Sequence, residues 1–174
     1  MLVSLEAPEV FAGKGKADKI KKNAQEALEE LYKSYPGAKA LAEKAEGILI
    51  FPDILKGGFI IGGQYGDGVL FRNGKAESYY RSLAASYGLQ AGAQRFGYAL
   101  FFMTQEDLNY IYTSDGWEIG VGPSLVIVDE DMALAKVVST TTTKKGVYAY
   151  IFGQKGLMAG LGIQGTKITR IYPR

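Results

Sequence analysis

The sequence predicts a single α+β domain: two N-terminal helices, a largely antiparallel multi-stranded sheet or barrel-like sandwich, and one short inserted helix. Helical apolar periodicity is confined to the N-terminal part of the chain and to one short segment near its middle. The rest consists of short β-rich runs separated by turn residues, and short connections favour antiparallel pairing. At 174 residues the chain can build one sizeable core, and no composition shift marks an internal boundary.

The N-terminal region divides into a leader and two helices. Residues 1–16 contain Pro8 and two glycines without a sustained period, which predicts a flexible leader and leaves 17–174 as the domain proper. We expect Asp18 to cap a helix that ends at Pro36. Its apolar stripe consists of Ile20, Ala24, Ala27, Leu28 and Leu31. A second, alanine-rich helix is expected over residues 38–46, with Gly47 as its stop.

The pattern then changes to strands. Asn73-Gly74 predicts a two-residue hairpin, because a type I′ turn requires positive φ at both positions. Residues 98–103 are apolar on both faces and predict a central strand. Thr104 is expected to begin a short helix through Tyr112. The other expected strands cover 47–51, 58–65, 69–72 (after a turn at 66–68), 78–80, 83–94, 117–121, 124–128, 133–141, 147–152, 157–164 and 167–172.

Two of these strands, 83–94 and 157–164, have one face that is nearly bare of side chains. Glycine is enriched, at 23 of 174 residues, against an average of about 7%. In a strand, such a face allows a neighbouring backbone or a ligand to approach closely. The segment Gly160–Gly165 matches the dinucleotide pattern GxGxxG, but the β-branched residues after it predict a strand where that motif needs a helix. We therefore interpret the glycines as architectural.

The composition excludes most catalytic chemistry. The chain has no cysteine and no histidine, which rules out thiol nucleophiles, histidine-dependent triads and Cys/His zinc sites. Its carboxylate pairs, 29–30, 106–107 and 129–131, fall on helix faces or in a loop, where solvation explains them. We expect no enzymatic activity, no cofactor and no metal site.

Charge is unevenly distributed although the net charge is only +2. No acidic residue follows Asp131, whereas seven basic residues do. These patterns fit either solvated faces that balance one another after folding or a surface that binds anions. A second basic cluster near the N-terminus consists of Lys14, Lys16, Lys19, Lys21 and Lys22.

Four motifs, in order and at similar spacing between Lys19 and Ile171, resemble those of the SYLF domain family. They are EGILIFP at 46–52, GGFIIGGQYGDGV at 57–69, SYGLQAGAQ at 86–94 and KGLMAGLGIQG at 155–165. The segments 152–158 and 165–171 are most similar to the bacterial branch. The resemblance implies non-enzymatic binding of anionic phospholipids in the periplasm or cell envelope. The export signal is expected to lie outside this sequence, because residues 1–6 lack signal-peptide features. The arginine of the eukaryotic signature is absent from 151–156, so actin binding is not expected.

The sequence thus predicts a lipid-binding domain with two groups of contact residues. Lys144, Lys145 and Lys155 are expected to contact headgroups, with Leu157 and Met158 as an apolar insertion. The cluster Lys14, Lys16, Lys19, Lys21 and Lys22 is expected to contribute second. No nucleic-acid partner is expected. Two alternatives remain, an envelope structural or protein-interaction module and a carrier of an apolar ligand.

Overall fold

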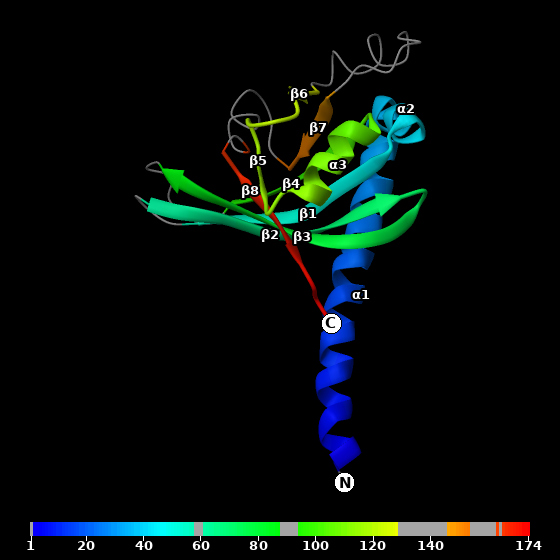
Figure 1. The fold of residues 1–174 in the computed structure, drawn as a ribbon, viewed down its shortest axis with the longest axis vertical. Coiled ribbons are helices and arrows are strands. Elements are labelled where there is room, and N and C mark those ends of the chain that lie inside the picture. Colours follow the sequence, from blue (N-terminus) through cyan, green and yellow to red (C-terminus); the bar gives the residue numbers. More distant parts are fainter. Residues whose placement is uncertain (1, 58–60, 88–93, 129–145, 154–162, 164) are drawn as a thin grey trace.

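The computed structural model describes residues 2–57, 61–87, 94–128, 146–153, 163 and 165–174, without the side chains of 2–14, 56–57, 61–62, 85–87 and 94. These residues form one curled, eight-stranded sheet with three helices (Figure 1). The strand order is β5-β8-β3-β2-β1-β4-β7-β6, and every pairing is antiparallel except β6 with β7. The predicted α+β class is confirmed.

Helix α1 (Leu2–Ser34) begins earlier than predicted. It is continuous across the expected leader, so Asp18 lies inside the helix and does not cap it. Once the packed turns have formed, each further residue adds a hydrogen bond without a new nucleation cost, which permits such an extension. The predicted stripe is confirmed. Ala24, Leu28 and Leu31 are buried, and Ile20 and Ala27 pack beside them.

Helix α2 (Pro36–Lys44) has a proline in its first turn, where the missing N–H costs nothing. It ends before Gly47, which is the first residue of β1 and not the helix stop that we predicted. At Gly47 an added Cβ would lie 3.0 Å from Leu108 of α3. The start of β1 is therefore closely packed against the Leu108 side chain, which would have to shift to admit a larger residue.

Strands β1 (Gly47–Gly57) and β2 (Ile61–Arg72) are longer than predicted. β1 does not stop at Pro52 but continues through an irregularity between Phe51 and Ile54. The turn predicted at 66–68 is wrong, because β2 is continuous through it. A Cβ on Gly66 would lie 2.6 Å from the carbonyl oxygen of Asp53. The glycines of β2 thus make room for the irregular backbone of β1. In the sequence, the same glycines resemble a turn.

Strand β3 (Lys75–Tyr87) follows the predicted Asn73-Gly74 turn, whose φ values of 51° and 75° confirm the type I′ geometry. Of the segment predicted at 83–94, residues 83–87 belong to β3 and Gln94 begins β4 (Gln94–Phe102), while 88–93 lie outside the described residues. The predicted central strand is confirmed, because every residue from Tyr98 to Met103 is buried.

Helix α3 (Gln105–Thr113) begins as predicted after Thr104. The Thr104 hydroxyl accepts a hydrogen bond from the Asp107 N–H (3.2 Å) and donates to the Asp107 carboxylate (2.7 Å). The same carboxylate accepts from the N–H of Gly146 (2.8 Å), which precedes β7 (Val147–Phe152). Asp107 therefore joins the start of α3 to a strand far away in the sequence.

The remaining strands are β5 (Trp117–Glu118), β6 (Leu125–Ile127) and β8 (Lys167–Ile171). The strand predicted at 133–141 lies outside the described residues. So does the one at 157–164 apart from Ile163, whose backbone is helical and whose side chain is fully buried.

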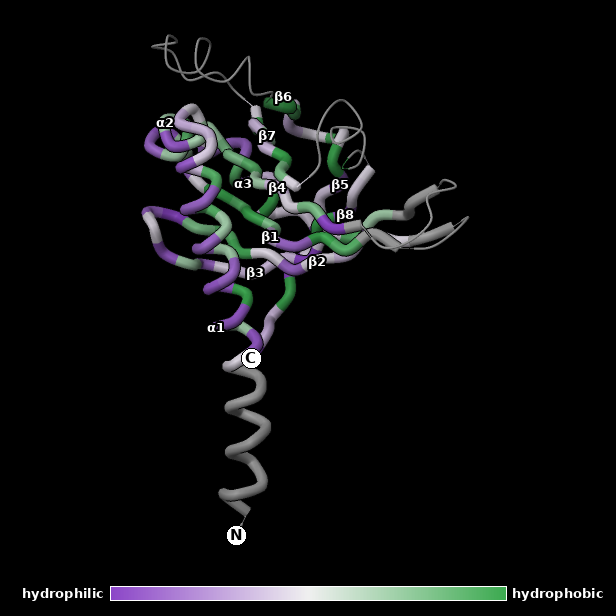
Figure 2. The backbone as a smooth tube through the Cα atoms, turned by 180° about the vertical axis from the view of Figure 1, so that it is seen from behind, coloured by the Kyte–Doolittle hydropathy of each residue, from purple (hydrophilic) through white to green (hydrophobic). Residues whose placement is uncertain are grey.

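Two apolar clusters lie on opposite faces of the sheet. The inner one joins the concave face to α3 and Trp117, and contains Leu100, Phe102 and Leu108. The outer one joins the other face to α1 and α2, and contains Ile50, Val69 and Phe101. Figure 2 shows the apolar segments in the strands and the polar ones along the described part of α1. Both faces of the central strands are thus buried, which explains their continuous apolar sequence.

Alkaline pH is expected to destabilise this fold. Burial raises the pKa of Tyr32, Tyr112 and Tyr150 to about 12, and in Tyr112 the hydrogen bond to Glu77 adds to this effect. In the unfolded chain the pKa of tyrosine is about 10. Above about pH 10 unfolding therefore releases protons, and the stability of the fold falls as the pH rises. Urea midpoints measured across this range should decrease. Tyr32→Phe should show a smaller decrease, and equal decreases in both proteins would contradict the assignment.

Candidate functional site

Half of the predicted contact residues, namely Lys144, Lys145, Lys155, Leu157 and Met158, lie outside the described residues. Their role stays a prediction. Lys14 belongs to α1, but its side chain is not among those described. The other four lysines of the N-terminal cluster can be placed.

Those four lysines lie on the described part of α1, away from its buried stripe. Lys16, Lys19 and Lys22 follow one another at intervals of three residues, which puts them along one side of a helix, and all three are exposed. Lys21 lies nearer the buried stripe and is half-buried. Within the described part of the chain none of these lysines forms an ion pair, and Asp18 is the only acidic residue between Lys16 and Lys22. Their ammonium groups are therefore available to an external anion.

The C-terminal end of β8 lies beside this part of α1. Ile171 pairs with Tyr79 of β3. The pKa of Tyr79 is raised by burial and, second, by the charge of Asp18, which places Asp18 of α1 close to that tyrosine. In the view of Figure 1 the C-terminus overlaps α1. Two segments about 150 residues apart in the sequence therefore both lie beside Tyr79 of β3.

The residues of β8 and its extension at this point are cationic and aromatic. Arg170 and Arg174 are exposed, and Tyr172 is 77% exposed. The Arg170 guanidinium carbon lies 5.1 Å from the centre of the Tyr172 ring, within cation–π range. We call the combined set the α1–β8 basic surface; it consists of Lys16, Lys19, Lys21, Lys22, Arg170, Tyr172 and Arg174, with the lysines on the outer side of the sheet and Arg170 on its concave side, beside Tyr80.

Arg170 of β8 and the following Tyr172 and Arg174 were not among the predicted contact residues. The two arginines entered only as part of an acid-free tail, and Tyr172 was not singled out. β8 pairs with β3, and Tyr79 of β3 lies close to Asp18 of α1, which brings this segment near the helix that carries the lysine cluster. A conceivable sequence signal was the alternation of Arg170, Tyr172 and Arg174, which puts all three on one side of a strand continued to the terminus.

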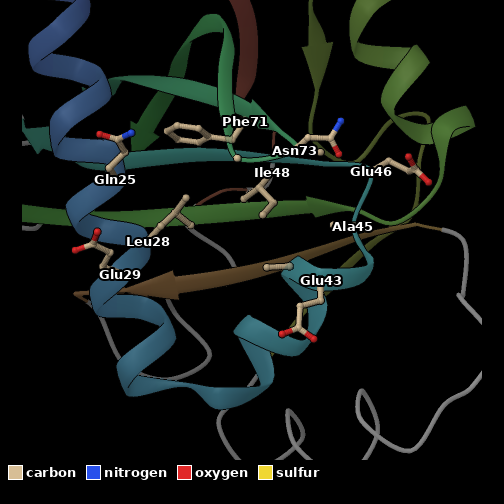
Figure 3. A pocket seen from close by; sticks show the side chains of 12 residues that line it. Gln25, Leu28, Glu29, Glu43, Ala45, Glu46, Ile48, Phe71 and Asn73 are labelled. Atoms are coloured by element: carbon tan, nitrogen blue, oxygen red, sulfur yellow. The ribbon is translucent and has the colours of Figure 1, made fainter.

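A cavity of about 550 Å³ opens at the other end of the described part of α1 (Figure 3). Leu28, Ile48 and Phe71 give it apolar walls. The carboxylates of Glu29, Glu43 and Glu46 surround it. Three carboxylates repel an anionic headgroup, so this cavity and the α1–β8 basic surface differ in the charge of the ligand they suit.

Most described carboxylates near the core form ion pairs or hydrogen bonds that stabilise the fold. Asp67 is paired with Arg81, at 2.8 Å, and Asp107 holds the start of α3. Among the described residues no three acidic side chains are grouped so that they could hold a metal ion. No helix in the described part of the chain is long and apolar enough to cross a membrane.

Comparison of the chain with models of protein families and with curated proteins finds no match. The resemblance to SYLF domains thus rests on the four sequence motifs, two of which, 46–52 and most of 57–69, lie in β1 and β2.

Proposed function

We propose that this protein is a non-enzymatic module that binds membranes containing anionic phospholipids. The α1–β8 basic surface carries the proposal, because it brings six cationic side chains and an exposed tyrosine to the region where α1 passes the end of β8, and within the described part of the chain its lysines form no ion pair. Each lysine or arginine close to an anionic membrane contributes about 1 kcal/mol, and tyrosine is favoured at the level of the headgroups.

The resemblance to the bacterial SYLF branch supports the same function and a location in the periplasm or cell envelope. Lys144, Lys145, Lys155, Leu157 and Met158 remain part of the proposal as a second contact region. Actin and nucleic acid are not proposed as partners.

Charge reversal on α1 tests the proposal. The triple variant Lys16→Glu, Lys19→Glu and Lys22→Glu should bind phosphatidylglycerol vesicles at least about a hundredfold more weakly than the unmodified protein, since three contributions of about 1 kcal/mol are lost. Co-sedimentation at several salt concentrations measures this. Binding of the unmodified protein should fall with salt and should be weak for phosphatidylcholine vesicles.

A matched variant separates local charge from net charge. Lys33→Glu, Lys39→Glu and Lys75→Glu change the net charge equally, at exposed positions outside the α1–β8 basic surface. This control should retain most of the binding. Equal loss in both triple variants, or equal binding of the unmodified protein to both kinds of vesicle, would contradict the proposal.

A carrier of an apolar ligand is the second candidate, and the cavity beside α2 is the observation that favours it. Its volume of about 550 Å³ falls within the usual range for small-molecule pockets, about 300–1,000 Å³. Native mass spectrometry of freshly purified protein should then reveal a bound molecule whose release follows Leu28→Trp, which fills the cavity.

A further inference from the structure

Three large apolar side chains are exposed in one row on the outer face of the sheet. Leu55 of β1 pairs with Tyr65 of β2, and Tyr65 pairs with Leu83 of β3. Their exposed fractions are 43%, 43% and 44%. We call Leu55, Tyr65 and Leu83 the outer-face row.

This row belongs to the face that α1 covers farther along the strands. Side chains alternate along a strand, so Tyr65 and Leu83 share their face with Val69 and Tyr79, which pack in the outer cluster under α1. Beyond the row, among the described residues an added Cβ on Gly63 would meet only the Ala84 carbonyl oxygen, at 3.7 Å. The apolar row is therefore left uncovered beside α1, on the same side of the sheet.

A cation lies at each end of the row. Arg95 of β4 pairs with Leu55, and Lys167 of β8 pairs with Leu83. The Arg95 side chain is 71% exposed and lies 3.6 Å from Asp53, an exposed ion pair of the kind that contributes about 0–1 kcal/mol. Arg95 can therefore exchange this partner for a phosphate with little loss. From Arg95 to Lys167 the row crosses four strand spacings, or about 19 Å.

Tyr65, at the centre of the row, is held rigidly. The Arg81 guanidinium lies 4.8 Å from the ring centre, and Arg81 is itself fixed by two hydrogen bonds to Asp67, of 2.8 and 3.2 Å. A side chain that is already ordered loses little entropy when it binds, which favours Tyr65 as an anchor. Tyrosine combines an apolar ring with a polar hydroxyl and therefore suits the boundary between headgroups and acyl chains.

We infer that the outer-face row enters the interfacial layer of a phospholipid bilayer, with Arg95 and Lys167 contacting phosphates at its two ends. This inference rests on the proposed function and adds the apolar part of the contact, which the α1–β8 basic surface lacks apart from Tyr172. A second copy of the chain is a poorer occupant. Stacking two such rows about a two-fold axis brings cation against cation at both ends.

A single fluorescent label tests the insertion directly. The chain has no cysteine, so Leu83→Cys provides a unique site for an environment-sensitive dye. With phosphatidylglycerol vesicles, its emission should shift to the blue and be quenched by lipids brominated on the acyl chains. The matched label at Asn109→Cys should show neither effect, because α3 packs on the opposite face of the sheet.

A double variant provides the energetic test. Leu55→Ser with Leu83→Ser should weaken vesicle binding by about tenfold or more, as expected from the loss of two partly buried leucines. This loss should persist at high salt, whereas the loss caused by reversing the α1 lysines is largest at low salt. An unchanged urea midpoint shows that the double variant is folded.

The outcomes separate the two proposals. If the unmodified protein binds anionic vesicles but the label at position 83 is neither shifted nor quenched, the row does not insert and only this inference fails. If the unmodified protein does not bind at all, the proposed function fails. If the protein is a dimer and the double variant is a monomer by light scattering, the row is an interface between copies and the inference is overturned.

Discussion

Trp117→Ala should lower the free energy of unfolding by about 3–5 kcal/mol, the usual range for deleting a buried large aromatic side chain. Trp117 is 1% exposed, and its ring centre lies 5.7 Å from that of Phe102. Its indole N–H donates a hydrogen bond to the Val121 carbonyl oxygen, at 2.9 Å. Removing the ring leaves a cavity between the concave face and the segment that follows β5, because those backbones can only partly close in.

Circular dichroism in urea is the suitable measurement, because Trp117 is the only tryptophan and its variants lose the fluorescence signal. Trp117→Phe is the matched control. It retains an aromatic ring and lacks mainly the hydrogen bond to Val121. Its free energy of unfolding should therefore fall much less than that of the alanine variant. Equal losses for the alanine and phenylalanine variants would show that ring packing against Phe102 is not what stabilises this part of the sheet.

Gly68→Ala should destabilise the protein by about 1–3 kcal/mol or more, the cost of forcing an extra carbon into a packed core. A Cβ at this position would overlap the Ile50 carbonyl oxygen and lie 2.6 Å from Cδ1 of Phe51. Because backbone is involved, β1 cannot yield by a rotamer change alone. The urea midpoint should fall without a change in slope, as expected when only the stability of the folded state changes.

Gly63→Ala provides the comparison on the same strand. Within the part of the chain that the structure describes, its Cβ would meet only the Ala84 carbonyl oxygen, at an ordinary 3.7 Å, and its φ does not lie in the left-handed region. This variant should be neutral or slightly more stable, since alanine restricts the unfolded chain. A similar decrease in the urea midpoint for Gly63→Ala and Gly68→Ala would contradict the close approach of β1 and β2 at Gly68.

Most helices and strands of this fold follow from local sequence signals. Thr104 predicted the start of α3, and Asn73-Gly74 predicted the hairpin; both were confirmed. The failures occurred where glycine or proline has a tertiary role. Gly66 and Gly68 mark close approach of β1 where a turn was predicted, and Pro52 lies within β1 where a strand end was predicted.

The candidate site could be predicted only in part. The lysine cluster on α1 is visible because it is contiguous in the sequence, but its union with Arg170, Tyr172 and Arg174 depends on the pairing of β8 with β3. Nothing local in the β8 sequence specifies that partner strand.

The sequence by itself determined the class of fold, the amphipathic stripe of α1 and the absence of histidine and cysteine chemistry, because these depend on residue type and local period. Only the tertiary structure decided the exposed row at Leu55, Tyr65 and Leu83. Next to the Asn73-Gly74 turn, Phe71 of β2 pairs with Ala76 of β3. The next residue of β2, Leu70, pairs with Ser78, so Glu77 is an extra, unpaired residue in β3. That one-residue shift sets Leu83, rather than Ser82, opposite Tyr65. A bulge whose glutamate accepts a hydrogen bond from Tyr112 of α3 is stabilised by a distant contact, and local periodicity contains no signal for it.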